Sequence, residues 1–399
     1  MAVRRTAIPS PTGTGASRLT TALLTCAMGF SMLQLFLLGA LGPRLVEELG
    51  VSATVLGLTT AMGFGVAAVL SPVGGRIVDR MGPRRSLVLL LSVSAVALAL
   101  IGSAPGTGLL LGAVALGGVP QALANPATNK AVLAAVPPER RGAVTGMKQS
   151  GVQLGAFAAG LPLAALAGGF GWRAAVWTAA GGALLAAVWA ARALPADPAP
   201  VLAAARAGFV PRGMVAWLAV FSLFLGAGIA SVNTYVALYG TQRLGMGPTA
   251  AAGLVAVLGL AGIGGRVGWS RAAVPGRAER LPAWLAFGAL GAAVLLGAAA
   301  SAPVLVWAGV LAIGVFAVSG NAVSMVLVVQ RAAPGRAGQD SALVAAGFFA
   351  GFAVGPSLFA PFAQTGRYGV GWTLVAVEFA LAGAVAWAWA VRDRRERGR

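Results

Sequence analysis

The 399-residue chain contains no histidine, a single cysteine (Cys26) and only 10 acidic residues. Without histidine there is no imidazole to relay protons, to complete a Ser-His triad or to bind a metal ion. A lone cysteine cannot form an intramolecular disulfide or a thiolate metal site, so we expect Cys26 to fill space in an apolar helix. With so few bases available to activate a nucleophile, the sequence predicts neither an enzyme nor a bound cofactor.

Apolar residues dominate what remains. Hydrophobic residues make up 58% of the chain, charged residues 10%, and the mean hydropathy is +0.85, far outside the range of soluble domains. Crossing about 30 Å of hydrocarbon takes roughly 20 helical residues. Runs of this length recur, and they predict an all-α integral membrane protein with twelve transmembrane helices near residues 20–42, 52–72, 86–104, 108–135, 143–166, 173–191, 213–239, 249–265, 282–300, 303–329, 339–362 and 370–391.

The net charge of +19 comes mainly from arginine. The distribution of the arginines along the chain distinguishes a membrane-orientation signal from a nucleic-acid-binding surface. If the N-terminus lies inside the cell, the inner segments carry 23 arginines and the outer ones carry only Arg44, Arg173, Arg243 and Arg367. Such an excess sets orientation in the membrane, so a nucleic-acid partner is not predicted. We expect a multi-pass protein of the bacterial cytoplasmic (inner) membrane, with both termini in the cytoplasm and the lipid bilayer as its surroundings.

A short basic segment with the sequence G-R-I-V-D-R-M-G-P-R-R separates the second and third predicted helices. Glycines allow a tight turn there, the arginines suit the cytoplasmic side, and one Asp supplies a local anion. The segment resembles the signature G-x-x-x-D-R-x-G-R-R between helices two and three of the major facilitator superfamily, with Pro83 as its only departure. The match lies at Gly75, Asp79, Arg80, Gly82 and Arg84, with Arg85 just beyond.

The resemblance implies a conformational switch at this segment. In the superfamily the Asp meets the start of helix eleven when the transporter faces outward, which here would bring Asp79 to residues 337–339. An anion at a helix N-terminus gains a few tenths to about 1 kcal/mol. The alternative is a local pair between Asp79 and Arg80 or Arg84.

The two halves of the chain repeat each other at an offset of 196 residues. Asn125 and Pro138 coincide with Asn321 and Pro334, and several glycines fall in the same register. We therefore expect two pseudo-symmetric six-helix bundles, as the resemblance implies. The predicted organisation is a disordered tail (1–19), an N-terminal bundle (20–192), a cytoplasmic linker (193–212), a C-terminal bundle (213–391) and a basic tail (392–399).

Polar side chains within the predicted helices are the candidate substrate contacts, because a membrane helix carries them only where they line water or protein. Gln121, Asn125 and Asn129 share one face of helix four, since they are spaced by four residues. The full set of candidates is Gln34, Gln121, Asn125, Asn129, Lys148, Gln149, Tyr235 and Asn321. Each could instead hydrogen-bond a neighbouring helix for about 1 kcal/mol.

The only two lysines are treated differently. Lys130 lies near the cytoplasmic end of its helix, so we expect it to extend toward that interface or to pair with Glu139. Lys148 lies inside helix five and has Val344 as its counterpart in the second half. A buried ammonium costs about 2.5 to 3.5 kcal/mol on insertion scales, and an anionic substrate would offset that cost. Hydrogen bonds to helix-end carbonyls, or a role for Lys148 as proton carrier, are the alternatives.

The sequence thus predicts a monomeric secondary transporter that moves a small organic or inorganic anion by alternating access, with or without a coupling proton or other ion. Proton-coupled efflux of an apolar compound is the alternative, with Glu378, the only acid deep in a predicted helix, as the proton carrier. A receptor that moves no solute is a further alternative, although the short loops leave no room for a folded signalling module.

Overall fold

A computed structural model describes residues 14–197, 210–273, 278–331 and 337–397, and within these ranges all regular structure is helical. Twelve helical segments are long and apolar enough to cross a membrane, which confirms the predicted number. Nine of them are single helices: α1 (Thr14–Ala40), α3 (Ala53–Met81), α4 (Pro83–Gly102), α9 (Trp172–Ala193), α10 (Met214–Leu244), α11 (Pro248–Ala272), α12 (Leu281–Ala298), α15 (Ala337–Gln364) and α16 (Tyr368–Arg397).

The remaining three spans change helix type or break along their length. The fourth is α5 (Thr107–Leu116) followed by α6 (Gly118–Ala135), and the fifth is α7 (Pro138–Ala158), a π-helical turn η1 (Ala159–Leu163) and α8 (Ala164–Phe170). The tenth is α13 (Leu305–Ala312), the π-helical turn η2 (Ile313–Ala317) and α14 (Val318–Arg331). A short helix α2 (Gly42–Leu49) connects α1 to α3.

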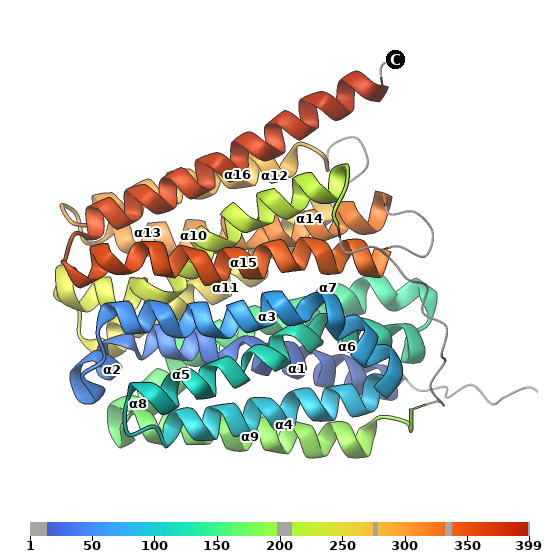
Figure 1. Cartoon of the computed structure of the whole chain (residues 1–399), viewed down its shortest axis with the longest axis horizontal. Helices are drawn as coiled ribbons and strands as arrows, with labels where there is room; N and C mark the ends of the chain where they lie inside the picture. Colours follow the sequence, from blue (N-terminus) through green and yellow to red (C-terminus); the bar gives the residue numbers. More distant parts are fainter. Residues whose placement is uncertain (1–13, 198–209, 274–277, 332–336, 398–399) are drawn as a thin grey trace, which may run out of the picture.

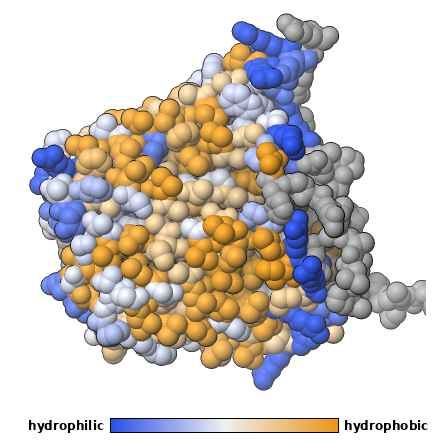
Figure 2. All heavy atoms as spheres, in the orientation of Figure 1, coloured by the Kyte–Doolittle hydropathy of each residue, from blue (hydrophilic) through white to orange (hydrophobic). Residues whose placement is uncertain are grey.

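The helices lie side by side along the long axis of the molecule, with α1 to α9 in the lower part of Figure 1 and α10 to α16 in the upper part. Figure 2 shows apolar side chains covering the middle of this face and hydrophilic side chains at both ends, as a membrane-spanning protein requires. We call the end where α3 meets α4 the basic end. It is the right-hand end of Figure 1, where α16 also finishes.

Several helix ends lie outside their predicted bounds, and three of them illustrate the reason. α1 begins at Thr14 within the predicted tail, α3 continues to Met81, and α16 continues to Arg397 through the predicted basic tail. Hydropathy marks where a helix leaves the hydrocarbon, whereas main-chain hydrogen bonding continues for as long as the residues tolerate helical dihedral angles. Polar helix-forming residues therefore extend these helices beyond the apolar runs.

The basic segment between α3 and α4 is almost entirely helical, which corrects the expectation of a loop. Gly75 lies inside α3 with no atom within 4 Å of the position of a Cβ, so it forms no turn. Gly82 alone reverses the chain, with φ = 86°, a value that side-chain-bearing residues rarely adopt. The departure at Pro83 has a simple reason: Pro83 is the first residue of α4, where proline is well tolerated.

Asp197, at the end of the first half, holds this turn in place. Its carboxylate oxygens accept hydrogen bonds from the main-chain N–H groups of Arg84 and Arg85, each at 2.8 Å. A Cβ at Gly82 would lie 2.4 Å from the Asp197 carboxyl carbon. The carboxylate thus satisfies free N–H groups at the N-terminus of α4 and lies at the positive end of the helix dipole.

Replacing Asp197 with alanine is expected to lower the free energy of unfolding by about 1 kcal/mol, the usual cost of losing an anionic helix cap. Asp197→Asn should cost less, because an amide oxygen can still accept one of the two bonds. Thermal unfolding of the purified protein in detergent measures both changes. Equal stability of Asp197→Ala and the wild type would contradict the capping role.

The internal repeat is visible in the irregularities of the helices. The fourth span breaks at Gly117, and the equivalent residue of the second half, Ile313, begins the π-helical turn of the tenth span. Asp197 and Asp393 are also equivalent at this offset. Asp393 accepts two hydrogen bonds from Arg331, at 2.8 and 3.2 Å. Asp197 thus connects the end of the first half to α4, and Asp393 connects α16 to α14.

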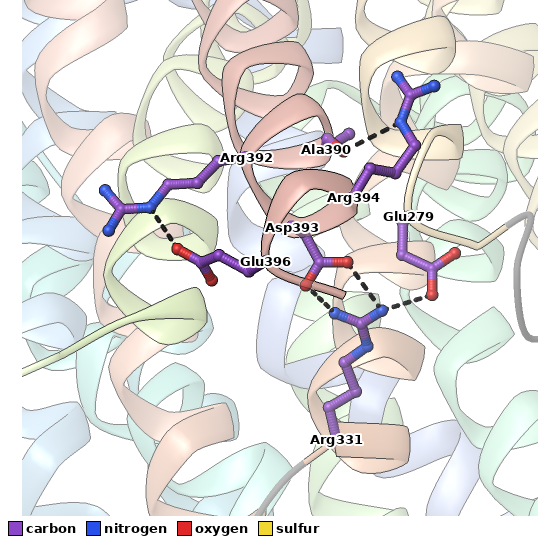
Figure 3. A network of polar contacts seen from close by, with 7 residues as sticks. All are labelled: Glu279, Arg331, Ala390, Arg392, Asp393, Arg394 and Glu396. Atoms are coloured by element: carbon purple, nitrogen blue, oxygen red, sulfur yellow. Dashed lines mark hydrogen bonds and ion pairs between the residues drawn. The ribbon is translucent and has the colours of Figure 1, made fainter. Parts of the chain in front are cut away.

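Arg331 is the centre of the network in Figure 3. Besides Asp393 it binds Glu279 at 2.5 Å, and its guanidinium lies 5.5 Å from the ring of Trp389. Two carboxylates and an aromatic ring therefore surround this one cation at the basic end of the second half.

The end opposite the basic end is closed by contacts between the two halves. The Tyr235 hydroxyl on α10 contacts the main-chain oxygens of Ala53 and Pro356, at 2.9 and 3.2 Å, and Thr60 on α3 bonds Thr234 on α10 at 2.9 Å. The Phe64 ring packs on Phe352 of α15 at 4.6 Å between centroids. α3, α10 and α15 are thereby held together across the boundary between the halves.

Tyr235→Phe is expected to weaken this closure, because the two carbonyl oxygens lose their shared donor, at a net cost of about 1 kcal/mol. In a Cys26→Ser background, a cysteine replacing the buried Thr60 should react faster with a water-soluble maleimide when Tyr235 is phenylalanine. Tyr239→Phe is the matched control, since its hydroxyl bonds Leu296 within the second half at 3.1 Å. Equal labelling rates in the two variants would contradict the prediction.

Candidate substrate site

Lys148 lies on α7 with none of its surface exposed. Its ammonium donates to the Thr128 hydroxyl and to the Asn129 side-chain oxygen, both at 2.6 Å. Thr128 in turn bonds the Ala124 carbonyl at 2.6 Å, so α6 presents a fixed hydroxyl to the lysine. An ammonium has three donors, and neutral oxygens take two of them.

A second polar contact lies next to the first. The Gln149 side-chain nitrogen donates to the Asn125 side-chain oxygen at 2.8 Å. Asn125 and Asn129 therefore use their oxygens to accept hydrogen bonds from α7, while their NH₂ groups bond no other residue within the described part of the chain. The structure brings together four of the predicted site residues: Asn125, Asn129, Lys148 and Gln149.

No carboxylate of the described residues lies within 4 Å of the Lys148 ammonium. Lys148 lies ten residues, or about 15 Å, after the start of α7 at Pro138, in a span that ends at Phe170. The site therefore lies well inside the fifth span, nearer to its basic end than to its opposite end.

Gln34 and Tyr235 lie elsewhere. Gln34 donates to the Val114 carbonyl at 3.3 Å and occupies the space beside Gly117, where a Cβ would lie 1.7 Å from its oxygen. Gly117 precedes Thr128 by eleven residues, or about 16 Å along the span. Tyr235 lies at the closed end described above. Each of these two side chains fills a gap between helices away from Lys148, and their part in substrate binding stays a prediction.

Gln121 and Asn321 keep unused polar atoms. Both side-chain polar atoms of Gln121, and the side-chain oxygen of Asn321, are buried without a hydrogen-bond partner in the described chain. Buried amides normally find partners, so these atoms remain available to water or to a ligand. Their membership in the substrate site stays a prediction.

The switch prediction falls partly outside what the structure describes. The side chains of Asp79 and of residues 337–339 lie outside the described residues, so their contact stays a prediction. Arg80 is exposed. Arg84 directs its guanidinium to the Ala191 carbonyl at the end of α9, where a cation is favourable. Lys130 donates to the Val78 carbonyl at 3.3 Å, so it joins α6 to the end of α3.

The structure adds one cation that sequence reasoning assigned to an inner loop. Arg266 lies inside α11, which continues to Ala272, and is only 9% exposed. The apolar residues after it (Val267, Gly268 and Trp269) were the available signal. Tyr239 is also buried, at 1% exposed.

Comparisons with known proteins agree with this architecture. A sequence profile of the Major Facilitator Superfamily matches residues 23–356. A bacterial homologue of the human lysosomal transporter Spinster, solved in an inward-facing and occupied conformation, superposes with a TM-score of 0.74 at 17% identity, covering 95% of this chain and 98% of the other. The nucleoside transporter NupG superposes with a TM-score of 0.73 at 11% identity, covering 93% and 98%. No curated protein sequence matches the chain.

Proposed function

The chain belongs to the Major Facilitator Superfamily, and we propose that this secondary transporter moves a small anion by alternating access, with Lys148 as its cationic contact. Family membership makes the protein a non-enzymatic membrane transporter. The identity of the solute and the side of the membrane on which each end lies belong to the proposal, in which the basic end faces the cytoplasm.

The observation that carries the proposal is a fully buried ammonium with neutral oxygens as its only partners in the described chain. A cation in a low-dielectric environment needs a compensating charge. An anion entering from the basic end would supply it at the third ammonium donor. The free NH₂ groups of Asn125 and Asn129 would then add neutral donors, which also suit an anion.

A thermal-stability screen tests the proposal directly. Purified full-length protein is heated with acetate, lactate, nitrate, chloride or uridine, or with a lipophilic cation. A ligand that binds only the folded state at 100 times its Kd stabilises by about 2.7 kcal/mol. We expect anions to raise the melting temperature at constant ionic strength. Uptake into proteoliposomes is then measured for the anion that stabilises the protein most. Stabilisation by uridine alone, matching the substrate class of NupG, or by the lipophilic cation alone, would overturn the anion proposal.

A second candidate function rests on Glu378. This residue on α16 is 5% exposed, and neither carboxyl oxygen has a hydrogen-bond partner in the described chain. An unpartnered carboxyl group among α10, α12 and α16 can take up and release a proton, as efflux of an apolar compound driven by a proton gradient would require. Loss of gradient-driven efflux in Glu378→Gln, with anion-dependent stabilisation intact, would favour this alternative.

A further inference from the structure

Arg266 is a second buried cation, and it belongs to the other half of the molecule. Its guanidinium donates one hydrogen bond, from Nη1 to the main-chain oxygen of Gln149 at 3.1 Å. Its Nε is buried without a partner in the described chain. A guanidinium has five N–H donors, so a single carbonyl leaves most of them unused.

The contrast with Arg331 shows that this is unusual for the chain. Arg331 is bound by two carboxylates, Glu279 and Asp393, at the polar end of its helix (Figure 3). Arg266 lies deeper in its span, yet no carboxylate of the described residues is within 4 Å of it. Among the cations that the structure describes, burial without a carboxylate partner is found at Arg266 and Lys148.

The two cations are linked through α7. The carbonyl that Arg266 binds belongs to Gln149, the residue next to Lys148. Arg266 lies six residues before the end of α11 at Ala272, and Lys148 lies ten residues after the start of α7 at Pro138, so both are inside their helices. No carboxylate of the described residues lies within 4 Å of either cation, so their charges add to a positive local potential.

Further unused polar atoms lie against α11 close to Arg266 in the chain. Gly262, one turn before it on α11, lies against the Gln153 side chain, whose oxygen would be 3.0 Å from a Cβ there. Gly265 lies against the Ser319 hydroxyl, which would be 2.6 Å from a Cβ. Both the Gln153 oxygen and the Ser319 hydroxyl are buried without partners in the described part of the chain. Unused polar groups of α7 and α14 thus lie against the turn of α11 that carries Arg266.

We propose that Arg266 is the second-half contact for the transported anion, which lies between it and Lys148, and that the preferred anion is a small planar oxyanion such as a carboxylate or nitrate. The inference rests on the proposed anion transport. A guanidinium presents parallel N–H donors that match two oxygens of a planar anion, whereas an ammonium acts as a point charge. In this proposal Lys148 attracts the negative charge of the anion, and Arg266 makes the site prefer planar anions over spherical ones such as chloride.

The arrangement also links binding to the approach of the two halves. Lys148 is on α7 of the first half and Arg266 on α11 of the second, so an anion that contacts both favours the conformation in which α7 and α11 are close. A ligand shifts a conformational equilibrium only by such differential contacts. The bond from the Arg266 guanidinium to the Gln149 carbonyl already crosses this boundary between the halves.

The test compares Arg266→Gln, Arg266→Lys and Lys148→Gln in the purified full-length protein, with acetate, nitrate and chloride as probes. The readout is the anion concentration that gives half-maximal thermal stabilisation. For Arg266→Gln we expect this concentration to rise at least about tenfold for acetate and nitrate, as for the loss of a charge-assisted hydrogen bond. Arg266→Lys should keep the response to chloride and lose the preference for the planar anions, an effect that a purely structural arginine would not produce.

Arg331→Gln is the control for the loss of an arginine from the same half, and it should lower stability without changing the anion concentrations. If Arg266→Gln and Arg266→Lys keep the wild-type response while Lys148→Gln loses it, the Arg266 inference fails and anion transport stands. If no variant changes the response, or no anion stabilises the wild type, the proposed function itself fails. Should Arg266→Gln not fold, the ratio of nitrate to chloride response in Arg266→Lys decides the question.

Discussion

Lys148→Gln is expected to abolish anion-dependent stabilisation and to reduce anion uptake roughly 10- to 100-fold. A hydrogen bond to a charged group contributes about 1.5 to 3 kcal/mol, and each 1.4 kcal/mol is a factor of ten in affinity. Glutamine can still donate to Thr128 or Asn129, which hold the ammonium at 2.6 Å, so the contact between α6 and α7 should survive. Removing a buried charge without a counter-ion is not expected to destabilise the fold.

Lys130→Gln is the matched control, because Lys130 is the only other lysine and bonds the Val78 carbonyl away from the site. Uptake into proteoliposomes, normalised to the amount of reconstituted protein, measures both variants. The prediction is contradicted if Lys148→Gln transports as well as the wild type, or if Lys130→Gln loses as much uptake as Lys148→Gln. Either result would assign Lys148 a purely structural role.

Gly351→Ala is expected to produce a large loss of stability, although it adds only a single methyl group. A Cβ at Gly351 would lie 2.0 Å from the Leu223 carbonyl oxygen. The same holds one turn to either side. A Cβ at Gly347 would lie 2.4 Å from the Ala219 carbonyl oxygen, and a Cβ at Gly355 would lie 2.2 Å from the Ala227 carbonyl oxygen. α15 and α10 therefore pack main chain against main chain, as small residues spaced by four allow in membranes.

The obstacle at Gly351 is main chain, so no rotation of a side chain can relieve the clash. Overpacking costs about 1 to 3 kcal/mol where neighbours can move, and we expect at least the upper part of this range. Thermal unfolding followed by tryptophan fluorescence provides the measurement, since the chain has 10 tryptophans.

Gly65→Ala is the control for Gly351→Ala. Gly65 lies inside α3 with nothing within 4 Å of a Cβ position, so alanine there should be neutral or stabilise by up to about 1 kcal/mol through helix propensity. Equal melting temperatures for Gly351→Ala and Gly65→Ala would show that α10 and α15 can move apart freely.

The twelve spans and the repeat were predictable because both depend on local properties. The hydrophobic content of roughly 20 consecutive residues decides whether a segment can cross a bilayer, whatever its neighbours are. The shared register of Asn125 and Asn321 likewise needs no coordinates. Helix ends were less predictable, as α3 shows: its apolar run finishes near residue 72, whereas the helix continues to Met81 because the basic residues that follow are compatible with helical hydrogen bonding.

The candidate site was predictable in part. Lys148, Asn125 and Asn129 stand out because polar residues are costly in apolar helices, and helical periodicity places the two asparagines on one face. Helical periodicity shows which residues share a face of a helix, but it does not show which other helix that face contacts. It could not indicate that Gln34 fills the gap at Gly117, or that Tyr235 joins α10 to α3 and α15, since both depend on how closely distant segments approach.

The sequence by itself determined a twelve-helix transporter of duplicated design with an unusual lysine in its fifth span, because hydropathy, repetition and composition are properties of the chain alone. The tertiary structure decided which charges are compensated. It places Asp197, 113 residues from Arg84, as the anion at the start of α4. It places no carboxylate of the described residues within 4 Å of Lys148 or Arg266. Compensation depends on distances of a few ångströms between residues far apart in the chain, and only folding sets those distances.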